Sequence, residues 1–191
     1  MSHNPRATLA GNSVRMIRPH LNDIPQVHFP DGYSIRPLRV EEGAVWSDVV
    51  LDAEPWLELS TDLFTNEFSH DLSSVPERCF FVVDRNDTPV GTISAWYKEL
   101  DGHNYGLVHW VAVRPPHQGK GLGKAGLSFA LQKLALWHER AMLGTQSKRL
   151  PAISLYLNFG FLPDLEEPAA VADWRLLKEQ LNHPVLNEMD L

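Results

Sequence analysis

Residues 105–124 read YGLVHWVAVRPPHQGKGLGK, an apolar run that ends at two prolines and continues as a glycine-rich turn. Odd-numbered and even-numbered positions of the run are both mostly apolar, which is the pattern of a strand that is covered on both faces of its sheet. Proline cannot donate to a strand ladder, so Pro115 and Pro116 end the strand. Good helix formers follow and predict a helix over residues 122–138. The stretch therefore predicts a buried central strand, a glycine turn and a helix in series.

The start of that helix has the chemistry of an anion-binding site. The first helical turn leaves N–H groups without backbone partners, and the helix dipole places partial positive charge there. Gly119, Gly121 and Gly123 let the backbone approach a phosphate closely, while Lys120 and Lys124 add formal charge. We therefore expect a phosphate-bearing ligand at this turn.

Two familiar glycine-loop signatures fit this turn poorly. The GLGKAG segment at residues 121–126 has the G-x-G-x-x-G spacing of dinucleotide-binding folds, but the following strand lacks the acidic residue that would bind a ribose. A Walker loop needs glycine at position 118 and Ser or Thr at position 125, where this chain has Gln118 and Ala125. A glycine turn that only joins a strand to a helix remains an open alternative.

Composition excludes several classes of protein. The 191 residues carry 17 basic and 24 acidic side chains, a formal charge of −7, and 43% are hydrophobic, as in an ordinary globular protein. A net negative charge argues against a protein that coats nucleic acid. With Cys79 as the single cysteine, we expect neither an internal disulfide nor a metal site. No segment approaches twenty apolar residues and no signal region opens the chain, so we expect a cytoplasmic protein without a membrane partner.

Hydrophobic periodicity predicts alternating strands and helices beyond the central stretch. Strands are expected at residues 33–38, 79–84, 90–97, 105–113 and 141–146 and from residue 161, with helices at residues 41–52, 62–70, 122–138, 151–158 and 171–181. Residues 1–32 contain four prolines and predict an extended N-terminal arm with little regular structure. We expect an α/β (α+β mixed sheet) domain over residues 33–165, and a C-terminal helix and tail over residues 166–191 packed on it.

Two motifs resemble those of the GNAT (GCN5-related) N-acetyltransferase superfamily. The QGKGLG segment at residues 118–123 is similar to the acyl-CoA loop of that family, Q/R-x-x-G-x-G/A, which follows a central strand. The AISLYLNFGF segment at residues 152–161 is similar to its second motif, A-I-x-L-Y-x-x-x-G-F, and lies at the usual separation. The resemblance implies a GNAT fold, in which helices flank a central mixed sheet. It also implies acetyl-CoA as co-substrate, no metal, and transfer of an acetyl group to a primary amine by direct attack in a ternary complex.

The resemblance also implies how acetyl-CoA is held. Backbone N–H groups of the glycine turn bind the diphosphate, and the central strand pairs with the pantetheine arm. The thioester carbonyl meets a backbone N–H at the position of Val111. The cofactor-binding residues expected on this basis are Val111, Ala112, Val113, Gln118, Gly119, Lys120, Gly121, Leu122, Gly123 and Lys124.

Two residues are expected to move protons. The second motif assigns Tyr156 the role of acid for the departing thiolate. His109 is the candidate base, and strict alternation along the strand places it on the same face as Val111 and Val113. A hydrogen-bonded buried histidine is the alternative reading of His109, and Glu99 is a second candidate base. An acceptor amine that is already neutral needs no base.

The chain departs from the family pattern at Arg149, after residue 164, and in its long N-terminal arm, which is extra. Arg149 stands where many members have the asparagine of the second motif, and we expect it at a CoA phosphate. A final strand hairpin is hard to find after residue 164.

The acceptor is expected to be a small-molecule, peptide or protein amine. Its channel is expected to be lined by aromatic and acidic residues, which suit a cationic amine: Trp46, Glu54, Trp56, Glu58, Asp62 and Phe64. A homodimer and a CoA-binding sensor without transfer chemistry both remain open.

Overall fold

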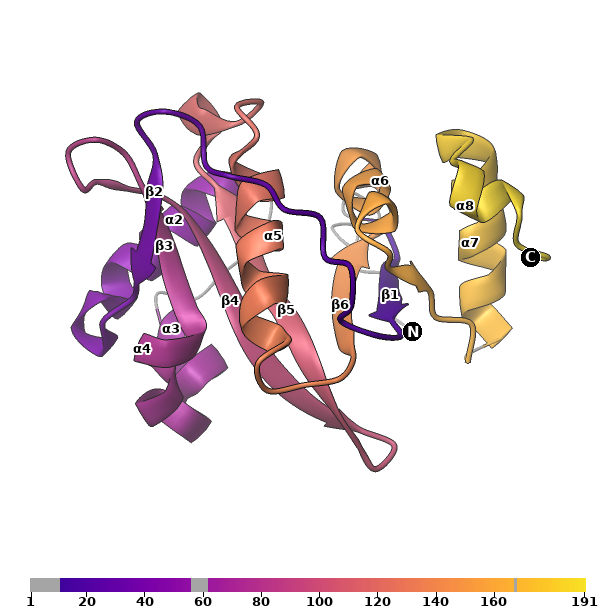
Figure 1. Ribbon diagram of the computed structural model, residues 1–191, viewed down its shortest axis with the longest axis horizontal. Helices are drawn as coiled ribbons and strands as arrows, with labels where there is room; N and C mark the ends of the chain where they lie inside the picture. Colours follow the sequence, from indigo (N-terminus) through magenta and orange to yellow (C-terminus); the bar gives the residue numbers. More distant parts are fainter. Residues whose placement is uncertain (1–10, 56–61, 167) are drawn as a thin grey trace, which may run out of the picture.

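A single seven-stranded mixed sheet organises the protein (Figure 1). The computed structural model describes residues 11–55, 62–166 and 168–191. The strand order is β2-β3-β4-β5-β6-β1-β7, and every neighbouring pair is antiparallel except β5 with β6. The strands are β1 (Ser13–Arg18), β2 (Ser34–Pro37), β3 (Cys79–Val83), β4 (Pro89–Leu100), β5 (His103–Val113), β6 (Ala141–Gln146) and β7 (Leu162–Pro163). The predicted fold class is confirmed, and the predicted central strand, β5, lies in the middle of the order.

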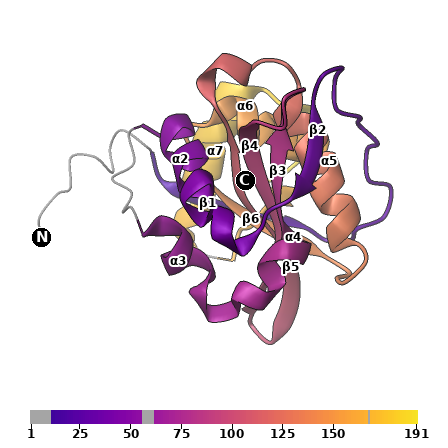
Figure 2. The same ribbon diagram turned by 90° about the vertical axis from the view of Figure 1, so that its left-hand side faces the viewer.

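Helices cover both faces of this sheet (Figure 2). One face carries the short helices α2 (Gly43–Ala53), α3 (Leu63–Phe68) and α4 (Val75–Arg78), with 3-10 turns η1 (Val40–Glu42) and η2 (Ser69–Ser74) beside them. The other face carries α5 (Leu122–Leu134), which follows the 3-10 turn η3 (Pro115–His117), and α6 (Leu150–Asn158). We call these the α2/α3 face and the α5/α6 face. Separate hydrophobic clusters fill the space under each face.

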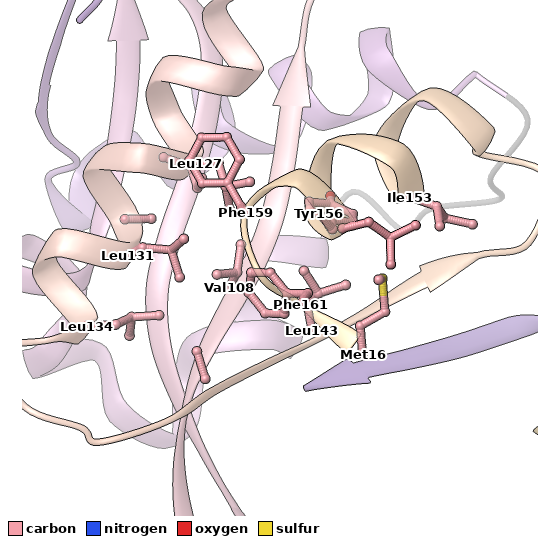
Figure 3. Close-up of a cluster of buried hydrophobic side chains, with 14 of the residues drawn as sticks. Met16, Val108, Leu127, Leu131, Leu134, Leu143, Ile153, Tyr156, Phe159 and Phe161 are labelled. Carbon is pink, nitrogen blue, oxygen red and sulfur yellow. The ribbon is translucent and has the colours of Figure 1, made fainter. Parts of the chain in front are cut away.

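The α5/α6 cluster is built from the apolar stripes of its helices (Figure 3). Leu127 and Leu131 of α5 and Tyr156 of α6 are buried against Val108 of β5 and Met16 of β1. On the α2/α3 face, Trp46, Phe64, Phe68 and Trp96 form a chain of ring contacts with centroids 5.0–5.6 Å apart. Such edge contacts between large rings fix how the short helices sit on the sheet.

The N-terminal arm contains a strand of the sheet. β1 pairs with β6 over its whole length, from Ser13 opposite Gln146 to Arg18 opposite Ala141, and it also pairs with β7. The expectation of little regular structure before residue 33 is therefore wrong for residues 13–18. The physical reason is burial: Val14 and Met16 are 3% and 0% exposed in the α5/α6 cluster, and they alternate with Ser13, Arg15 and Ile17, which are more exposed. This N-terminal strand thus covers one edge of β6 and lies between β6 and β7 in the sheet.

After β1 the chain crosses over α5, as Figure 1 shows. Ser128 on α5 fixes this crossing: its hydroxyl accepts from the Val27 N–H at 3.1 Å and donates to the Pro25 carbonyl at 2.6 Å. The buried guanidinium of Arg18 donates to the Phe159 carbonyl at the end of α6 and to the Asn22 carbonyl. The rest of the described arm has little regular structure, and these bonds hold it to both helices.

Helix ends depart modestly from the predicted ranges. α5 stops at Leu134, four residues early, because Leu136 and Trp137 close i→i+3 hydrogen bonds to Lys133 and Leu134. The C-terminal segment forms α7 (Pro168–Leu181), which starts before the predicted residue 171, and an unpredicted α8 (Pro184–Asn187). Trp174, Leu177 and Leu186 are buried in the α5/α6 cluster. α7 and α8 therefore pack against the α5/α6 face of the sheet.

Candidate active site

A bulge interrupts the central strand next to the predicted site. Thr92 of β4 pairs with Ala112 of β5 and Ser94 pairs with His109, so β5 carries one extra residue between the two pairs. Trp110 takes the left-handed backbone conformation there, with φ of 47°. A bulge leaves an extra residue outside the ladder and bends its strand. A large aromatic residue at positive φ is unusual, and such strain is concentrated at functional sites.

The bulge also reverses the side-chain alternation along β5. His109 lies on the α2/α3 face, where its ring centroid is 6.3 Å from that of Phe68. Val111 packs on the opposite face with the α5/α6 cluster, and Val113 packs with Leu122 of α5. The expectation that His109 shares a face with Val111 and Val113 is therefore wrong, because it assumed strict alternation. The strand instead presents histidine to one side of the sheet and the two valines to the other.

A cavity of about 450 Å³ opens where β5 and β6 part. These parallel strands pair only at Gly106 with Ala141 and at Leu107 with Met142. Beyond those pairs, residues 108–112 of β5 and residues 142–146 of β6 line opposite walls of the cavity. Beyond Leu107, the β6-facing edge of β5 has no strand partner among the described residues, as the expected contacts of Val111 and Val113 with a pantetheine arm require.

Tyr156 and His109, the two predicted catalytic residues, both line this cavity from opposite faces of the sheet. Tyr156 projects from α6 among core residues (Figure 3), and its side chain is buried. Burial raises the pKa of the phenol to about 12, an effect that Glu54 reinforces and Arg149 opposes. The hydroxyl of Tyr156 is thus protonated at neutral pH, as a proton donor must be, while the raised pKa also makes it a weaker acid.

Glu67 holds His109, a contact that the sequence analysis missed. The Nε2 atom of His109 lies 3.0 Å from Oε2 of Glu67 on α3, and the indole N–H of Trp110 donates to the same oxygen at 2.9 Å. These hydrogen bonds, with that from His109 the stronger influence, hold the pKa of Glu67 below its usual range despite partial burial. His109 is thus hydrogen-bonded, as in the alternative reading, but its side chain is 30% exposed and not buried, which leaves a role for it at the cavity. Glu99 lies exposed near the β4–β5 turn, outside the residues that line the cavity.

An ion pair spans the wall of the cavity next to Tyr156. The guanidinium of Arg149, at the start of α6, donates to Oε2 of the buried Glu54 at 2.7 Å. The structure thus assigns Arg149 a carboxylate partner at the cavity, and the expected contact with a CoA phosphate stays a prediction. Of the predicted acceptor-channel residues that the structure describes, Glu54 alone lines the cavity.

The other expected acceptor-channel residues that the structure describes lie away from the cavity. Trp46 and Phe64 are buried in the aromatic cluster of the α2/α3 face, and Asp62 is exposed outside the cavity lining. Trp56 and Glu58 lie outside the described residues. The wall on the α2/α3 side includes two cationic residues that the sequence analysis did not single out, Arg15 of β1 and Lys98 of β4. The order of strands in the sheet brings β1 and β4 to the cavity, and local sequence patterns do not give that order.

The glycine turn has the geometry expected of an anion-binding helix start. Gly121 is the residue before α5 and has φ of 82°, a conformation that favours glycine. At Gly123 the conformation is helical, and a Cβ there would meet no described atom within 4 Å. Packing of the protein therefore does not require glycine at 123, and the open space beside it is what an approaching diphosphate needs.

Residues around the turn fix its position. Gln118 of the motif donates from its side chain to the Val113 carbonyl at 2.9 Å, which ties the turn to the end of β5. Lys120 donates to the hydroxyl of Tyr33 at 3.1 Å, and that hydroxyl is 3.0 Å from Nδ1 of His117. Lys124 lines a second hollow, of about 570 Å³, between α5 and α6. The arm also reaches this hollow through Pro25.

Substitutions at Gly123 test whether this open space serves a ligand. Because no described atom fills it, Gly123→Leu is expected to leave the thermal stability unchanged while weakening binding of acetyl-CoA by roughly tenfold or more. Gly123→Ala is the graded control, since a methyl group leaves most of the space open. Calorimetric titration measures both. Equal affinity in the leucine variant would show that the ligand does not approach this turn.

Comparison with known proteins places the chain in a family. The model of the acetyltransferase (GNAT) family matches residues 41–161. The L-amino acid N-acyltransferase MnaT of Escherichia coli is 28% identical over 130 residues, 65% of this chain and 68% of that protein. The mycothiol acetyltransferase of Pseudarthrobacter chlorophenolicus is 30% identical over 160 residues, 73% of this chain but only 45% of that protein. A GCN5-related N-acetyltransferase structure from Sphaerobacter thermophilus superposes with a TM-score of 0.59 at 22% identity, over 83% of this chain and 51% of the other.

The chain belongs to the GNAT acetyltransferase family. The family resemblance, the fold and the class of enzyme expected from the two motifs, an N-acetyltransferase, are thereby confirmed. Within the part of the chain that the structure describes, no cluster of three or more His, Cys, Asp or Glu residues is arranged to hold a metal ion. Among the same residues no helix combines the length and apolar character needed to cross a membrane.

Proposed function

We propose that the protein transfers an acetyl group from acetyl-CoA to the primary amine of a small molecule, by direct attack of the amine on the thioester in a ternary complex. One observation carries the proposal: the cavity between β5 and β6 is lined by Tyr156 from one face of the sheet and by His109 from the other. Acid and base groups then approach a single thioester from opposite sides. In this proposal the catalytic unit runs from β1 to β7, because β1 contributes Ser13 and Arg15 to the cavity wall.

Acetyl-CoA enters from the α5/α6 face in this proposal. The glycine turn at the start of α5 presents backbone N–H groups and two lysines to the diphosphate. The hollow between α5 and α6, which Lys124 lines, supports passage of the ligand from this turn toward the cavity. The free edge of β5 then offers N–H and carbonyl groups to the amides of the pantetheine arm.

The thioester carbonyl gains negative charge as the amine attacks. The bulge at Trp110 and Val111 leaves an extra residue outside the β4–β5 ladder, which supports the backbone N–H of Val111 as the hydrogen-bond donor to that oxygen. Tyr156 then donates its proton to the sulfur of the departing thiolate. His109 accepts a proton from the acceptor amine, through water if the two are not in contact.

The acceptor approaches from the α2/α3 face. The cavity wall on that side carries both signs of charge: Lys98 is cationic, Arg15 forms ion pairs with Asp164 and Glu166, and Glu54 pairs with Arg149. This mixture suits an amine that also carries an anionic group such as a carboxylate. The names of two relatives, one acting on L-amino acids and one on mycothiol, support a small-molecule acceptor over a protein.

A thiol-release assay tests the proposed reaction. Purified protein is mixed with acetyl-CoA and a panel of amines comprising free L-amino acids, their carboxamides, amino sugars and short peptides, and free CoA is detected with a thiol reagent. The single cysteine, Cys79, does not interfere, because burial raises its pKa to about 12 and leaves the thiol unreactive. We expect thiol release with α-amino acids and much slower release with the matched carboxamides.

Two results would contradict the proposal in different ways. Release that is equal for amino acids and their carboxamides would remove the role of the anionic group but leave the transfer reaction. Binding of acetyl-CoA without release on any amine of the panel would contradict transfer and favour the sensing module as the function of this cavity.

A further inference from the structure

Glu67 connects two neighbouring residues of the bulge to helix α3. Its Oε2 atom lies 3.0 Å from Nε2 of His109 and accepts the indole N–H of Trp110 at 2.9 Å. The two partners are consecutive on β5, whereas Glu67 lies more than forty positions earlier in the chain. The side chains of Glu67 and His109 are each 30% exposed, so water only partly screens their interaction.

The protonation state of Glu67 determines where the histidine proton lies. Its lowered pKa keeps the carboxylate ionised at neutral pH, and an ionised carboxylate accepts hydrogen bonds without donating any. The nitrogen of His109 that faces it, Nε2, therefore carries the hydrogen. In neutral His109 the other ring nitrogen, Nδ1, is then the one with a free lone pair.

The same carboxylate supports the strained residue of the bulge. Trp110 is held at φ of 47° although large side chains disfavour this conformation. Its indole is fixed by the hydrogen bond to Glu67 and by an edge contact with Trp46, at 5.5 Å between centroids. Trp110 directly precedes Val111 in the bulge. The orientation of the Trp110 indole therefore affects the position of the Val111 backbone N–H, which is expected to meet the thioester oxygen.

We propose that Glu67 is a positioning residue for the transfer reaction: it fixes His109 as the Nε2–H tautomer, so that Nδ1 takes the proton of the acceptor, and it holds Trp110 in the bulge. The inference rests on the proposed function, since it takes His109 as the base. In the step concerned, an N–H bond of the acceptor ammonium breaks, its electron pair stays on the amine nitrogen, and the proton binds Nδ1. The resulting imidazolium faces the carboxylate of Glu67, which stabilises it.

Glu67→Gln tests this role with little change of shape. The amide keeps the size of the side chain but loses its charge, and its NH₂ group competes as a donor to Nε2. We expect kcat to fall about tenfold to a hundredfold, while the KM for acetyl-CoA changes less than about twofold. Glu77→Gln on α4 is the matched control, because Glu77 is an exposed glutamate outside the cavity lining, and we expect no change.

Nitrogen NMR of the histidine side chains reports the tautomer directly and does not depend on turnover. The His109 signal is assigned by its loss in His109→Gln. We expect neutral His109 of the wild type to be the Nε2–H tautomer, Glu67→Gln to give a mixture of tautomers, and Trp110→Phe to retain Nε2–H, because its Glu67–His109 bond remains.

The two measurements separate failure of this inference from failure of the proposed function. A wild-type protein that binds acetyl-CoA but acetylates no amine contradicts the proposed function, and the NMR result still decides whether Glu67 fixes the tautomer. A Glu67→Gln variant with unchanged kcat and an unchanged tautomer overturns the positioning role, even if its melting temperature falls. In that case Glu67 only ties α3 to the sheet.

Discussion

Replacing Tyr156 with phenylalanine is expected to lower kcat about a hundredfold, because a positioned acid contributes at least that factor to proton transfer. The hydroxyl makes no hydrogen bond to another described residue, and the ring keeps its packing with Phe161 at 6.0 Å between centroids. The free energy of unfolding should therefore change by less than about 1 kcal/mol. Steady-state kinetics with saturating acetyl-CoA, together with urea unfolding, measure both effects.

The pH dependence sharpens this test. Burial raises the pKa of Tyr156 to about 12, so the acid stays protonated as the pH rises, and kcat should not decline from its ionisation between neutral pH and about pH 10. Tyr105→Phe is the matched control, since Tyr105 is also a buried tyrosine but lies outside the cavity lining. Equal kcat in Tyr156→Phe and wild type would remove the hydroxyl from the mechanism.

Met16→Ala is expected to destabilise the protein by about 2–5 kcal/mol, the range for truncating a fully buried large side chain. Met16 is 0% exposed and packs in the α5/α6 cluster, although it lies in the N-terminal arm. Its neighbour Ile17 is only partly buried and points to the other face of β1, so Ile17→Ala should lose about 1 kcal/mol. Urea unfolding of the two variants gives the comparison. A loss at Met16 no larger than that at Ile17 would mean that β1 is not part of the folding core.

Local chemistry made the middle of the chain predictable. Prolines end β5, glycines turn the chain, and good helix formers follow, so each step of this stretch is specified within a few residues. The same holds for the hairpin at residues 79–100 and for α6, whose proline lies in its first turn. Both predicted catalytic residues reach one cavity because these elements form as expected.

The missed features depend on contacts between distant parts of the chain. β1 was obscured by the prolines that follow it, although Val14 and Met16 alternate with the more exposed Ser13, Arg15 and Ile17, as in a strand with one buried face. The bulge was hidden because Trp110, Val111 and Ala112 are all apolar, and such a run carries no sign of where alternation breaks. Glu67 belongs to a short amphipathic helix, and only the folded chain brings it to His109.

Calorimetric titration with acetyl-CoA is the most direct test of the central claim, that the opening between β5 and β6 holds the thioester of acetyl-CoA. Dephospho-CoA, NAD and ATP are titrated in parallel. We predict binding of acetyl-CoA at one site, roughly micromolar in affinity, with much weaker binding of NAD and ATP. Absence of acetyl-CoA binding, or tighter binding of NAD or ATP, would contradict the account.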